Sequence, residues 1–363
     1  MKFRCERDVL VEALATAGRA VSGRGTLPGL SGVRAQLTGD QLRLTGSDLD
    51  LTITIAVLVS GETDGVAVIP ARLASDIVRS LEPGAVSVTA DGDELLISAG
   101  RSQFSIRLIA GDEFPQIEQI ATEPVELASA QLADALKQVV PAASNDDSRP
   151  PLTGVLFASE NGGLRLVATD SYRLAMRDVP GVSVLAEGQS VLIPSRALSE
   201  LNRILAQGEK VELRLGEREA SFHVGSVDLI TRLIEADFPN YRGLIPESHP
   251  NSLTVSRDEL LDALRRVKLL AREATPVRLE MSDDGLELAA VTQDVGTARE
   301  QLEGTYDGTA LTVAFNPQYL LEGIDVASSD EIVLSTIDEL RPAVVRIPGS
   351  SDFLYLLMPV RVS

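Results

Sequence analysis

The side chains best suited to catalysis or metal binding are few and widely separated in this sequence. The 363 residues include two histidines, His223 and His249, and one cysteine, Cys5. None stands at a spacing typical of a zinc site or a Cys–His pair, and neither a phosphate-binding loop nor a dinucleotide fingerprint occurs. The glycine-rich stretch 18–32 follows a predicted helix, so we expect a surface loop there. The sequence gives no reason to predict an enzyme, and we expect no catalytic residue, metal or cofactor.

Three aspartates, Asp48, Asp170 and Asp294, recur at equivalent junctions between predicted strands. Carboxylates at such positions could be interpreted as catalytic groups. Asp side chains, however, often accept hydrogen bonds from the backbone that follows them and so form turns. We therefore expect these residues to cap turns.

Basic side chains recur along one stripe of two predicted helices. Arg72 and Arg79 are seven residues apart, and Arg196 and Arg203 repeat this spacing, which places each pair on one helix face. These could be ordinary solvated faces with internal ion pairs. Recurrence in repeated units favours a shared surface, which could contact phosphates without recognising bases. In the third copy the corresponding positions are not basic: Gln318, Glu322 and Asp325.

The elements that carry these residues are repeated three times, with a period of about 120 residues. A helical signature recurs at 10–14 (LVEAL), 132–136 (LADAL) and 260–264 (LLDAL), with leucines four apart on one face. Ser129 and Ser256 precede two of these helices and are predicted N-caps. The full pattern predicts helices at about 6–20, 71–80, 129–141, 195–207, 256–272 and 316–325.

The segments between the helices are predicted strands. Leu49, Leu51, Ile53, Ile55, Val57 and Val59 alternate with other residues, as in a half-buried strand. A strand leads into a Pro-initiated helix in each repeat, and Phe-Pro closes the first two repeats at 114–115 and 238–239. The order helix, strands, helix, strands predicts an α+β domain with helices on one side of an antiparallel sheet.

The bulk composition restricts the possible functions. The formal net charge of −20 argues against broad binding of nucleic acid, so a DNA contact would need a local basic surface. One cysteine cannot form an intrachain disulfide. The N-terminal residues lack a signal peptide, and no apolar run reaches the ~18 residues of a membrane span. We expect a cytoplasmic protein with no membrane partner.

Three longer segments resemble the bacterial DNA polymerase III beta subunits, the beta sliding clamps. They are 169–175 (TDSYRLA), 238–246 (FPNYRGLIP) and 355–361 (YLLMPVR), with support from 26–28 (TLP) and 315–317 (FNP). The resemblance covers essentially the whole chain.

The resemblance implies a non-catalytic processivity factor that encircles DNA. It implies three clamp domains, at 1–122, 123–250 and 251–363, and a head-to-tail homodimeric ring with helices lining the inside and sheets outside. The implied partners are double-stranded DNA without sequence preference, a second copy, the catalytic subunit of the replicative polymerase, an ATP-driven clamp loader and other proteins with a clamp-binding motif. The residues expected to face DNA are Arg19, Arg24, Arg72, Arg79, Lys137, Arg149, Arg196, Arg203, Arg265, Lys268 and Arg272.

The resemblance also implies a hydrophobic peptide-binding cleft between the second and third domains, in which apolar side chains hold a peptide and Arg173 helps to orient it. Without the resemblance, the C-terminal apolar run would be interpreted as an interior strand. The implied cleft residues are Leu152, Thr169, Ser171, Tyr172, Arg173, Leu174, Pro239, Gly243, Leu244, Leu340, Pro342, Leu356, Leu357, Met358, Pro359 and Val360.

The dimer seam would pack Phe104 and Ile106 of the first domain against Leu269 and Leu270 of the third, with Arg101 and Arg107 facing Glu300 and Glu303. Gly243 and Ser171 depart from the family pattern. These departures suggest an open cleft rim and, as a hypothesis, a second, diverged clamp that tolerates a cleft inhibitor. Two other functions stay open: a cytosolic scaffold that binds proteins but not DNA, and an enzyme with a site between the repeats.

Overall fold

The computed structural model describes residues 1–21, 27–110, 114–115, 117, 120–160, 162–271, 275–293 and 295–361. Arg24, Arg272 and Asp294 therefore lie outside the described residues. The chain divides into two compact units, which we call unit 1 (Met1–Ala130 with Glu200–Leu233) and unit 2 (Gln131–Ser199 with Ile234–Ser363).

Six α-helices occur in the described residues, close to the six predicted ranges. They are α1 (Arg7–Gly18), α2 (Ala71–Ser80), α3 (Ser129–Val139), α4 (Ser195–Ile204), α5 (Arg257–Lys268) and α6 (Pro317–Asp325). The predictions extended past the ends of α1, α3, α4 and α5. Short 3₁₀ turns at Val140–Ala142 and Leu205–Gln207 follow α3 and α4. Among these residues, no helix is both long and apolar enough to cross a bilayer.

The predicted N-caps have different outcomes. Ser256 caps α5, since its Oγ accepts a hydrogen bond from the Glu259 amide. The prediction for Ser129 is wrong: it is the first residue of α3, and its buried Oγ has no hydrogen-bond partner among the described residues. Asn316, which was not predicted, caps α6 by accepting from the Gln318 and Tyr319 amides.

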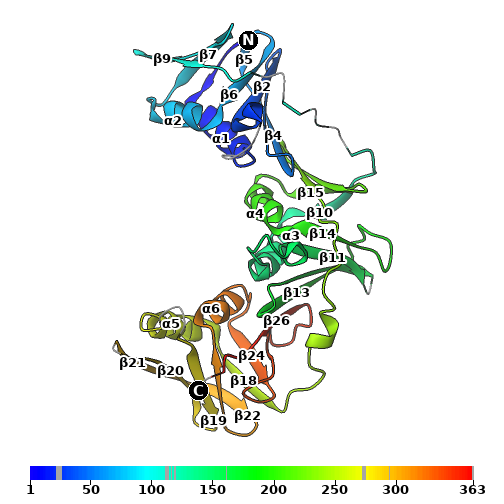
Figure 1. Cartoon of the computed structure of the whole chain (residues 1–363), viewed down its shortest axis with the longest axis vertical. Coiled ribbons are helices and arrows are strands. Elements are labelled where there is room, and N and C mark those ends of the chain that lie inside the picture. The colour runs from blue at the N-terminus through cyan, green and yellow to red at the C-terminus, as the bar shows by residue number, and fades with distance from the viewer. Residues whose placement is uncertain are drawn as a thin grey trace. The chain divides into compact units, whose positions relative to one another are not determined.

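Unit 1 contains two antiparallel sheets. The first has the order β5 (Ser60–Thr63), β1 (Lys2–Glu6), β7 (Ala85–Asp91), β8 (Glu94–Ala99) and β9 (Ser102–Arg107). The second has the order β10 (Val125–Ala128), β15 (Lys210–Leu215), β16 (Glu219–Val224), β17 (Val227–Arg232), β4 (Leu51–Leu58), β3 (Gln41–Ser47), β2 (Gly32–Thr38) and β6 (Gly65–Pro70). Helices α1 and α2 lie side by side in this unit (Figure 1).

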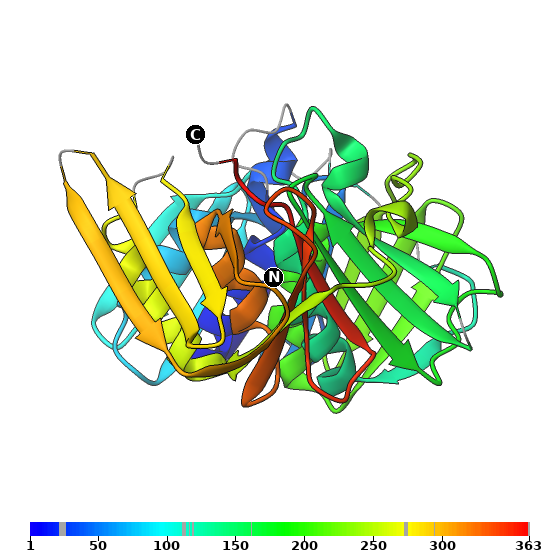
Figure 2. The same ribbon diagram turned by 90° about the horizontal axis from the view of Figure 1, so that it is seen from below.

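Unit 2 also contains two antiparallel sheets. The larger has the order β14 (Ser190–Pro194), β11 (Gly154–Glu160), β12 (Gly163–Thr169), β13 (Arg173–Pro180), β26 (Phe353–Leu357), β25 (Ala343–Arg346), β24 (Glu331–Thr336), β18 (Asn251–Ser256) and β22 (Gly304–Asp307). The smaller has the order β21 (Gly296–Leu302), β20 (Gly285–Thr292), β19 (Val277–Ser282) and β23 (Leu311–Phe315). Figure 2 shows β26, in red, beside the green strands that include β13.

The same element order occurs three times along the chain. Each repeat has a strand, a helix, a group of strands, a second helix and three final strands. The final strands are β9, β17 and β26, and the strands after the Asp junction are β4, β13 and β21. Strand β17 pairs with β4, and β26 pairs with β13. Strands β9 and β21 are left at sheet edges.

The repeated aspartates form turns in the two copies that the structure describes. The Asp48 carboxylate accepts from the Asp50 and Leu51 amides at 3.1 and 2.8 Å. The Asp170 carboxylate accepts from the amides of Tyr172 and Arg173 at 2.9 and 3.0 Å. The turn prediction is therefore confirmed for Asp48 and Asp170.

The predicted strand around Leu49 begins too early. Leu49 lies in the Asp48 turn with a positive φ of 79°, and its side chain is exposed. The strand starts at Leu51, and the predicted alternation is confirmed for Leu51, Ile53 and Ile55, which are buried. Val57 is half-buried, and Val59 lies beyond the end of the strand at Leu58. The equivalent residue of the second repeat, Ser171, has a φ of 81°, so the turn requires a left-handed residue in both copies.

Candidate functional site

The turn between β12 and β13 presents an exposed aromatic side chain. Thr169 Oγ1 accepts from the Ser171 amide at 3.2 Å and donates to the Arg173 carbonyl at 2.7 Å. Together with the Asp170 carboxylate, these bonds fix the turn and leave Tyr172 58% exposed. The Met358 amide donates to the Tyr172 carbonyl at 2.9 Å. The turn thus brings Tyr172 next to the segment that follows β26.

An apolar cluster lies on one face of the paired strands β13 and β26. Leu174 pairs with Leu356, and Met176 pairs with Leu354. Because side chains alternate along a strand, these four share one face. The apolar cluster consists of Val167, Leu174, Met176, Tyr241, Val344, Leu354 and Leu356, with Leu156, Phe238 and Ile245 packed against it.

Two of the predicted cleft residues lie on the other face of this sheet. Arg173 pairs with Leu357, one position from Leu174 and Leu356, so the pleat directs both side chains away from the apolar cluster. Leu357 is fully buried, and Arg173 is 8% exposed. Arg173 and Leu357 therefore lie on the opposite face of the sheet from Leu174 and Leu356, and all five residues of β26 are interior.

Arg173 is surrounded by acceptors from its own chain. Its guanidinium donates to Asp170 Oδ2 at 3.1 Å, to the Pro141 carbonyl at 2.6 Å and to Glu322. A buried guanidinium is costly unless such partners are present. Tyr355 Oη lies 3.5 Å from Nη1. Arg173 therefore fixes the turn and α6 in place, and has little capacity left to bind a peptide.

An aromatic stack links the exposed turn to α6. The Tyr172 and Tyr319 rings stack with centroids 6.3 Å apart. The Arg173 guanidinium lies 4.4 Å from the centre of the Tyr319 ring, and Tyr355 Oη donates to the Tyr319 carbonyl at 2.8 Å. The position of Tyr172 is therefore coupled to α6 by direct contacts.

Ion pairs and hydrogen bonds hold Tyr241 and Arg242 against the larger sheet of unit 2. Arg165 donates to Asp178 at 2.6 and 2.8 Å and to Glu160 at 2.6 Å. The bidentate Asp178 carboxylate raises the pKa of Arg165. Glu160 also accepts from Arg242 and, at 3.4 Å, from Tyr241 Oη. These bonds position Tyr241 in the apolar cluster, and its burial raises the pKa of the phenol.

Four predicted cleft residues outside the strands, which we call the rim, have exposed apolar side chains. Leu244, Leu340, Met358 and Val360 are each more than a third exposed. An ideal Cβ on Gly243 would meet no atom within 4 Å, so the rim is open there. Of the other predicted cleft residues, Leu152 and Thr169 are buried, Pro239 is exposed, and Pro342 and Pro359 are half-buried.

Several members of the apolar cluster were not predicted from the sequence. Met176 and Leu354 stand two residues from the predicted Leu174 and Leu356, so strand periodicity could have found them. Tyr241 lies within the motif 238–246 but was not selected. Val167 and Val344 join through strand pairing that no local pattern reveals.

The predicted basic helix residues are exposed but mostly paired with nearby acids. Arg79, Arg203 and Arg265 each form an ion pair with an acid three residues earlier, at 3.8, 3.2 and 3.1 Å respectively. Such exposed pairs are weak, each worth at most ~1 kcal/mol. The guanidinium groups can therefore exchange these partners for phosphates.

The other basic residues have varied surroundings. Arg19 pairs with Glu200 at 3.8 Å, and Arg149 pairs with Asp146 at 3.0 Å. Lys268 donates to Gln318. The remaining three are exposed on helices: Arg72, Lys137 and Arg196.

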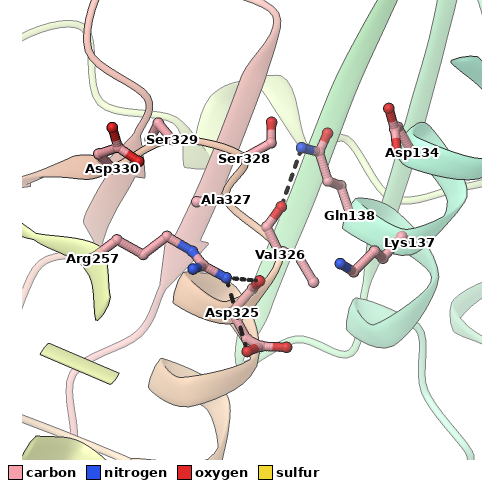
Figure 3. Close-up of a pocket in the computed structure, with 10 residues that line it drawn as sticks. All are labelled: Asp134, Lys137, Gln138, Arg257, Asp325, Val326, Ala327, Ser328, Ser329 and Asp330. Atoms are coloured by element: carbon pink, nitrogen blue, oxygen red, sulfur yellow. Dashed lines mark hydrogen bonds and ion pairs between the residues drawn. The ribbon is translucent and has the colours of Figure 1, made fainter. Parts of the chain in front are cut away.

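Lys137 projects toward a polar pocket of about 310 Å³ in unit 2 (Figure 3). Gln138 Nε2 donates to the Val326 carbonyl at 3.2 Å, and Arg257 donates to the Asp325 carbonyl at 2.7 Å. These bonds join α5 to the last residue of α6, and α3 to the residue that follows it. Three carboxylates line this pocket against two cationic side chains, so it does not extend the basic surface: Asp134, Asp325 and Asp330.

The predicted seam residues lie on exposed elements. Phe104 and Ile106 belong to the edge strand β9. Leu269 is 85% exposed just after α5. Arg266 donates to Glu300 at 2.7 and 3.0 Å and lowers the pKa of that carboxyl group. Glu300 is thus already engaged within its own chain.

No group of metal-ligating residues occurs in the described parts of the chain. The His223 Nδ1 atom lies 2.7 Å from an Asp228 carboxylate oxygen.

Comparison with known proteins extends over all three repeats. Family models match the N-terminal domain of the DNA polymerase III beta subunit at residues 1–118, its central domain at 126–240 and its C-terminal domain at 242–361. The beta sliding clamp of Streptomyces coelicolor is 32% identical over 100% of both chains. Among solved structures, the Bacillus subtilis sliding clamp is 30% identical with a TM-score of 0.92. The Bartonella birtlesii clamp bound to griselimycin is 31% identical, also with a TM-score of 0.92, and both structural matches cover 100% of each chain.

Proposed function

Since the chain belongs to the DNA polymerase III beta subunit family, we propose that two copies of it close into a ring around duplex DNA. The chain has the three-domain clamp fold and is a DNA sliding clamp, the non-catalytic processivity factor of a replicative polymerase. As a replication protein it would act in the cytoplasm. We place the domain boundaries at 1–122, 123–250 and 251–363, which the threefold element order supports.

The observation that carries the ring proposal is the pairing between repeats. The last strand of one repeat joins the strand after the Asp junction of the preceding repeat, as β17–β4 and β26–β13. The same two positions stay open as β9 and β21. Pairing β9 of one copy with β21 of the next would repeat the internal junction and, applied twice, close the ring. Leu269, Leu270, Phe104 and Ile106 would then pack at that seam.

DNA would be held by topology and by weak contacts with phosphates. Arg79 on α2, Arg203 on α4 and Arg265 on α5 are paired with nearby carboxylates, so their attraction for a phosphate is moderate. Moderate, sequence-independent contacts permit sliding. The acidic remainder of the chain would keep stray DNA from its outer surface.

The apolar cluster and its rim would bind short peptides of client proteins. Leu244, Leu340 and Met358 are exposed anchors beside a buried apolar floor, and Met adapts to different partners. Client classes would be the catalytic subunit of the polymerase, a clamp loader and other proteins with a clamp-binding motif. The griselimycin-bound clamps of Bartonella birtlesii and Pseudomonas aeruginosa support a ligand site on this fold.

The ring proposal is tested by Leu269→Asp. A charged side chain at a buried seam should convert a dimer into a monomer, as measured by sedimentation velocity. The matched control is Leu58→Asp, because Leu58 is 81% exposed and outside the proposed seam. A wild-type monomer, or a dimer that survives Leu269→Asp, would contradict the proposal.

The cleft proposal is tested by titrating griselimycin into the wild type and into Leu244→Asp. The variant should bind at least about tenfold more weakly, since a carboxylate replaces an apolar anchor, whereas Leu58→Asp should bind like the wild type. Equal affinity of all three proteins would remove Leu244 from the site.

The proposal of a diverged second clamp with an open rim at Gly243 predicts weak griselimycin binding by the wild type, and ordinary affinity would exclude it.

A further inference from the structure

A groove of about 1020 Å³ lies on the eight-stranded sheet of unit 1. It extends across the junction of β4 and β17, with Arg34 and Arg43 on one side of the junction and Asp228 and His223 on the other. Its volume is in the range of known ligand sites. The proposed functions use none of these residues.

Strand register shows that this groove is the repeat equivalent of the apolar cluster in unit 2. The β4–β17 junction corresponds to the β13–β26 junction, since each joins a final strand to the strand after an Asp turn. In unit 2, one row of paired residues crosses the sheet as Leu156, Val167, Met176 and Leu354. In unit 1, the equivalent row is Arg34, Thr45, Thr54 and Asp228.

The two equivalent strand junctions therefore differ in the polarity of their side chains. All four side chains of the unit 2 row are apolar, and all four of the unit 1 row are polar or charged. Ser221 occupies the position in unit 1 that Val344 occupies in unit 2. Ser221 pairs with Ile230, and Val344 pairs with the equivalent residue Leu356. Apolar side chains also line the groove: Val66, which is 54% exposed, and Ile230 on the sheet, and Phe114, Ile117 and Ile120 from the segment after β9. A peptide bound here would meet hydrogen-bonding side chains with an apolar margin.

The charges favour an acidic ligand. Asp228 is paired with His223 at 2.7 Å, and Glu212 is paired with Arg214 at 3.1 Å. Arg43, by contrast, has no partner among the described residues. Arg34 uses one nitrogen to bind Gln36 at 3.0 Å and keeps further donors. Both carboxylates of the groove therefore have a partner within it, as does Arg214, whereas Arg34 and Arg43 keep donors for a ligand. The three arginines outnumber the two carboxylates, in a chain whose net charge is −20.

We infer that this groove is a second peptide-binding site, for an extended acidic segment of a partner protein. Carboxylates of the segment would bind Arg34 and Arg43, and its apolar side chains would contact Val66 and Ile230. A nucleic acid strand fits less well, because its regular row of phosphates would also meet the carboxylates of Asp228 and Glu212. The site is separate from the griselimycin-type cleft and does not depend on it.

The test measures fluorescence anisotropy of a labelled octapeptide of alternating Asp and Leu, added to the full chain saturated with griselimycin. If griselimycin does not bind, the measurement uses the Leu244→Asp variant, whose cleft is disrupted by the substitution. We expect the Asp-Leu peptide to bind and the matching Lys-Leu peptide not to bind. Arg43→Glu should weaken binding by about tenfold or more, because repulsion replaces an ion pair.

The matched control is Arg4→Glu, which reverses an exposed arginine on β1 of the other sheet in unit 1 and should change the affinity less than about twofold. Equal loss in both variants would show nonspecific attraction and overturn the inference. So would absence of binding, equal binding of the Lys-Leu peptide, or stronger binding of a single-stranded oligonucleotide. Failure of the cleft would instead appear as loss of griselimycin binding with the groove affinity intact.

Discussion

At the scale of single residues, the Asp turn is the motif that recurs between the repeats. Asp48 and Asp170 accept the same pair of backbone hydrogen bonds, and both turns contain a residue with positive φ. Asp170 also binds the buried Arg173, at 3.1 Å from Nε. Its carboxylate thus compensates part of the cost of burying the Arg173 charge.

We predict that Asp170→Ala lowers the free energy of unfolding by about 3 kcal/mol, because it leaves a buried charge short of a partner. The control is Asp338→Ala, which removes two turn hydrogen bonds and an exposed ion pair with Arg341 and should cost about 1 kcal/mol. Chemical denaturation of both variants measures the difference. Equal losses would mean that Arg173 does not depend on Asp170.

The motif around Arg173 could be found from the sequence, but its role could not. The resemblance implies that Arg173 orients a bound peptide, and the structure adds that its guanidinium binds Glu322 and lies near Tyr355. These partners lie 149 and 182 residues away in sequence, and no local pattern can reveal them. Leu244, Met358 and Val360, by contrast, lie within the segments that the sequence indicated.

At the scale of elements, helix α6 packs closely against β26. Gly323 of α6 faces the Tyr355 ring, and an ideal Cβ at this position would overlap it. Tyr355 in turn donates to the Tyr319 carbonyl, and burial raises its pKa. This contact sets the distance between the helix and the strand that carries the floor of the proposed cleft.

Gly323→Ala should therefore destabilise the protein by about 2 kcal/mol, the usual cost of overpacking a close contact. The control is Gly18→Ala at the end of α1, where a Cβ would have open space; it should be neutral or stabilise by about 0.5 kcal/mol. Thermal unfolding compares the two. Similar melting temperatures would show that α6 can move away from β26 without cost.

Local patterns predicted the elements well and their ends less well. The leucine spacing located the helices, while Pro141 contributed to an early end of α3 because it lacks an amide hydrogen. Ser129 looked like a cap, but the backbone is already helical there. Leu49 continued the apolar alternation, yet the turn bonds of Asp48 exclude it from the strand. In each case the backbone conformation and its hydrogen bonds, and not the sequence pattern, determined where the helix or strand begins or ends.

At the scale of the whole molecule, the central claim is that repetition produces closure. Three repeats join through two equivalent strand pairings, β17–β4 and β26–β13, and leave the two matching edges β9 and β21 open. These pairings join strands more than 170 residues apart, so the sequence repeats predicted the domains but not how they join. A ring closed by the same pairing needs only weak contacts to stay on DNA, which explains how a strongly acidic chain can serve on a polyanion.

The most direct test of that claim is retention on DNA after loading by a clamp loader and ATP. Wild-type protein should remain on nicked circular DNA through gel filtration at high salt and be lost when one cut makes the same DNA linear, since salt screens contacts but not topology. Equal retention on circular and linear DNA, or loss from both, would contradict the account.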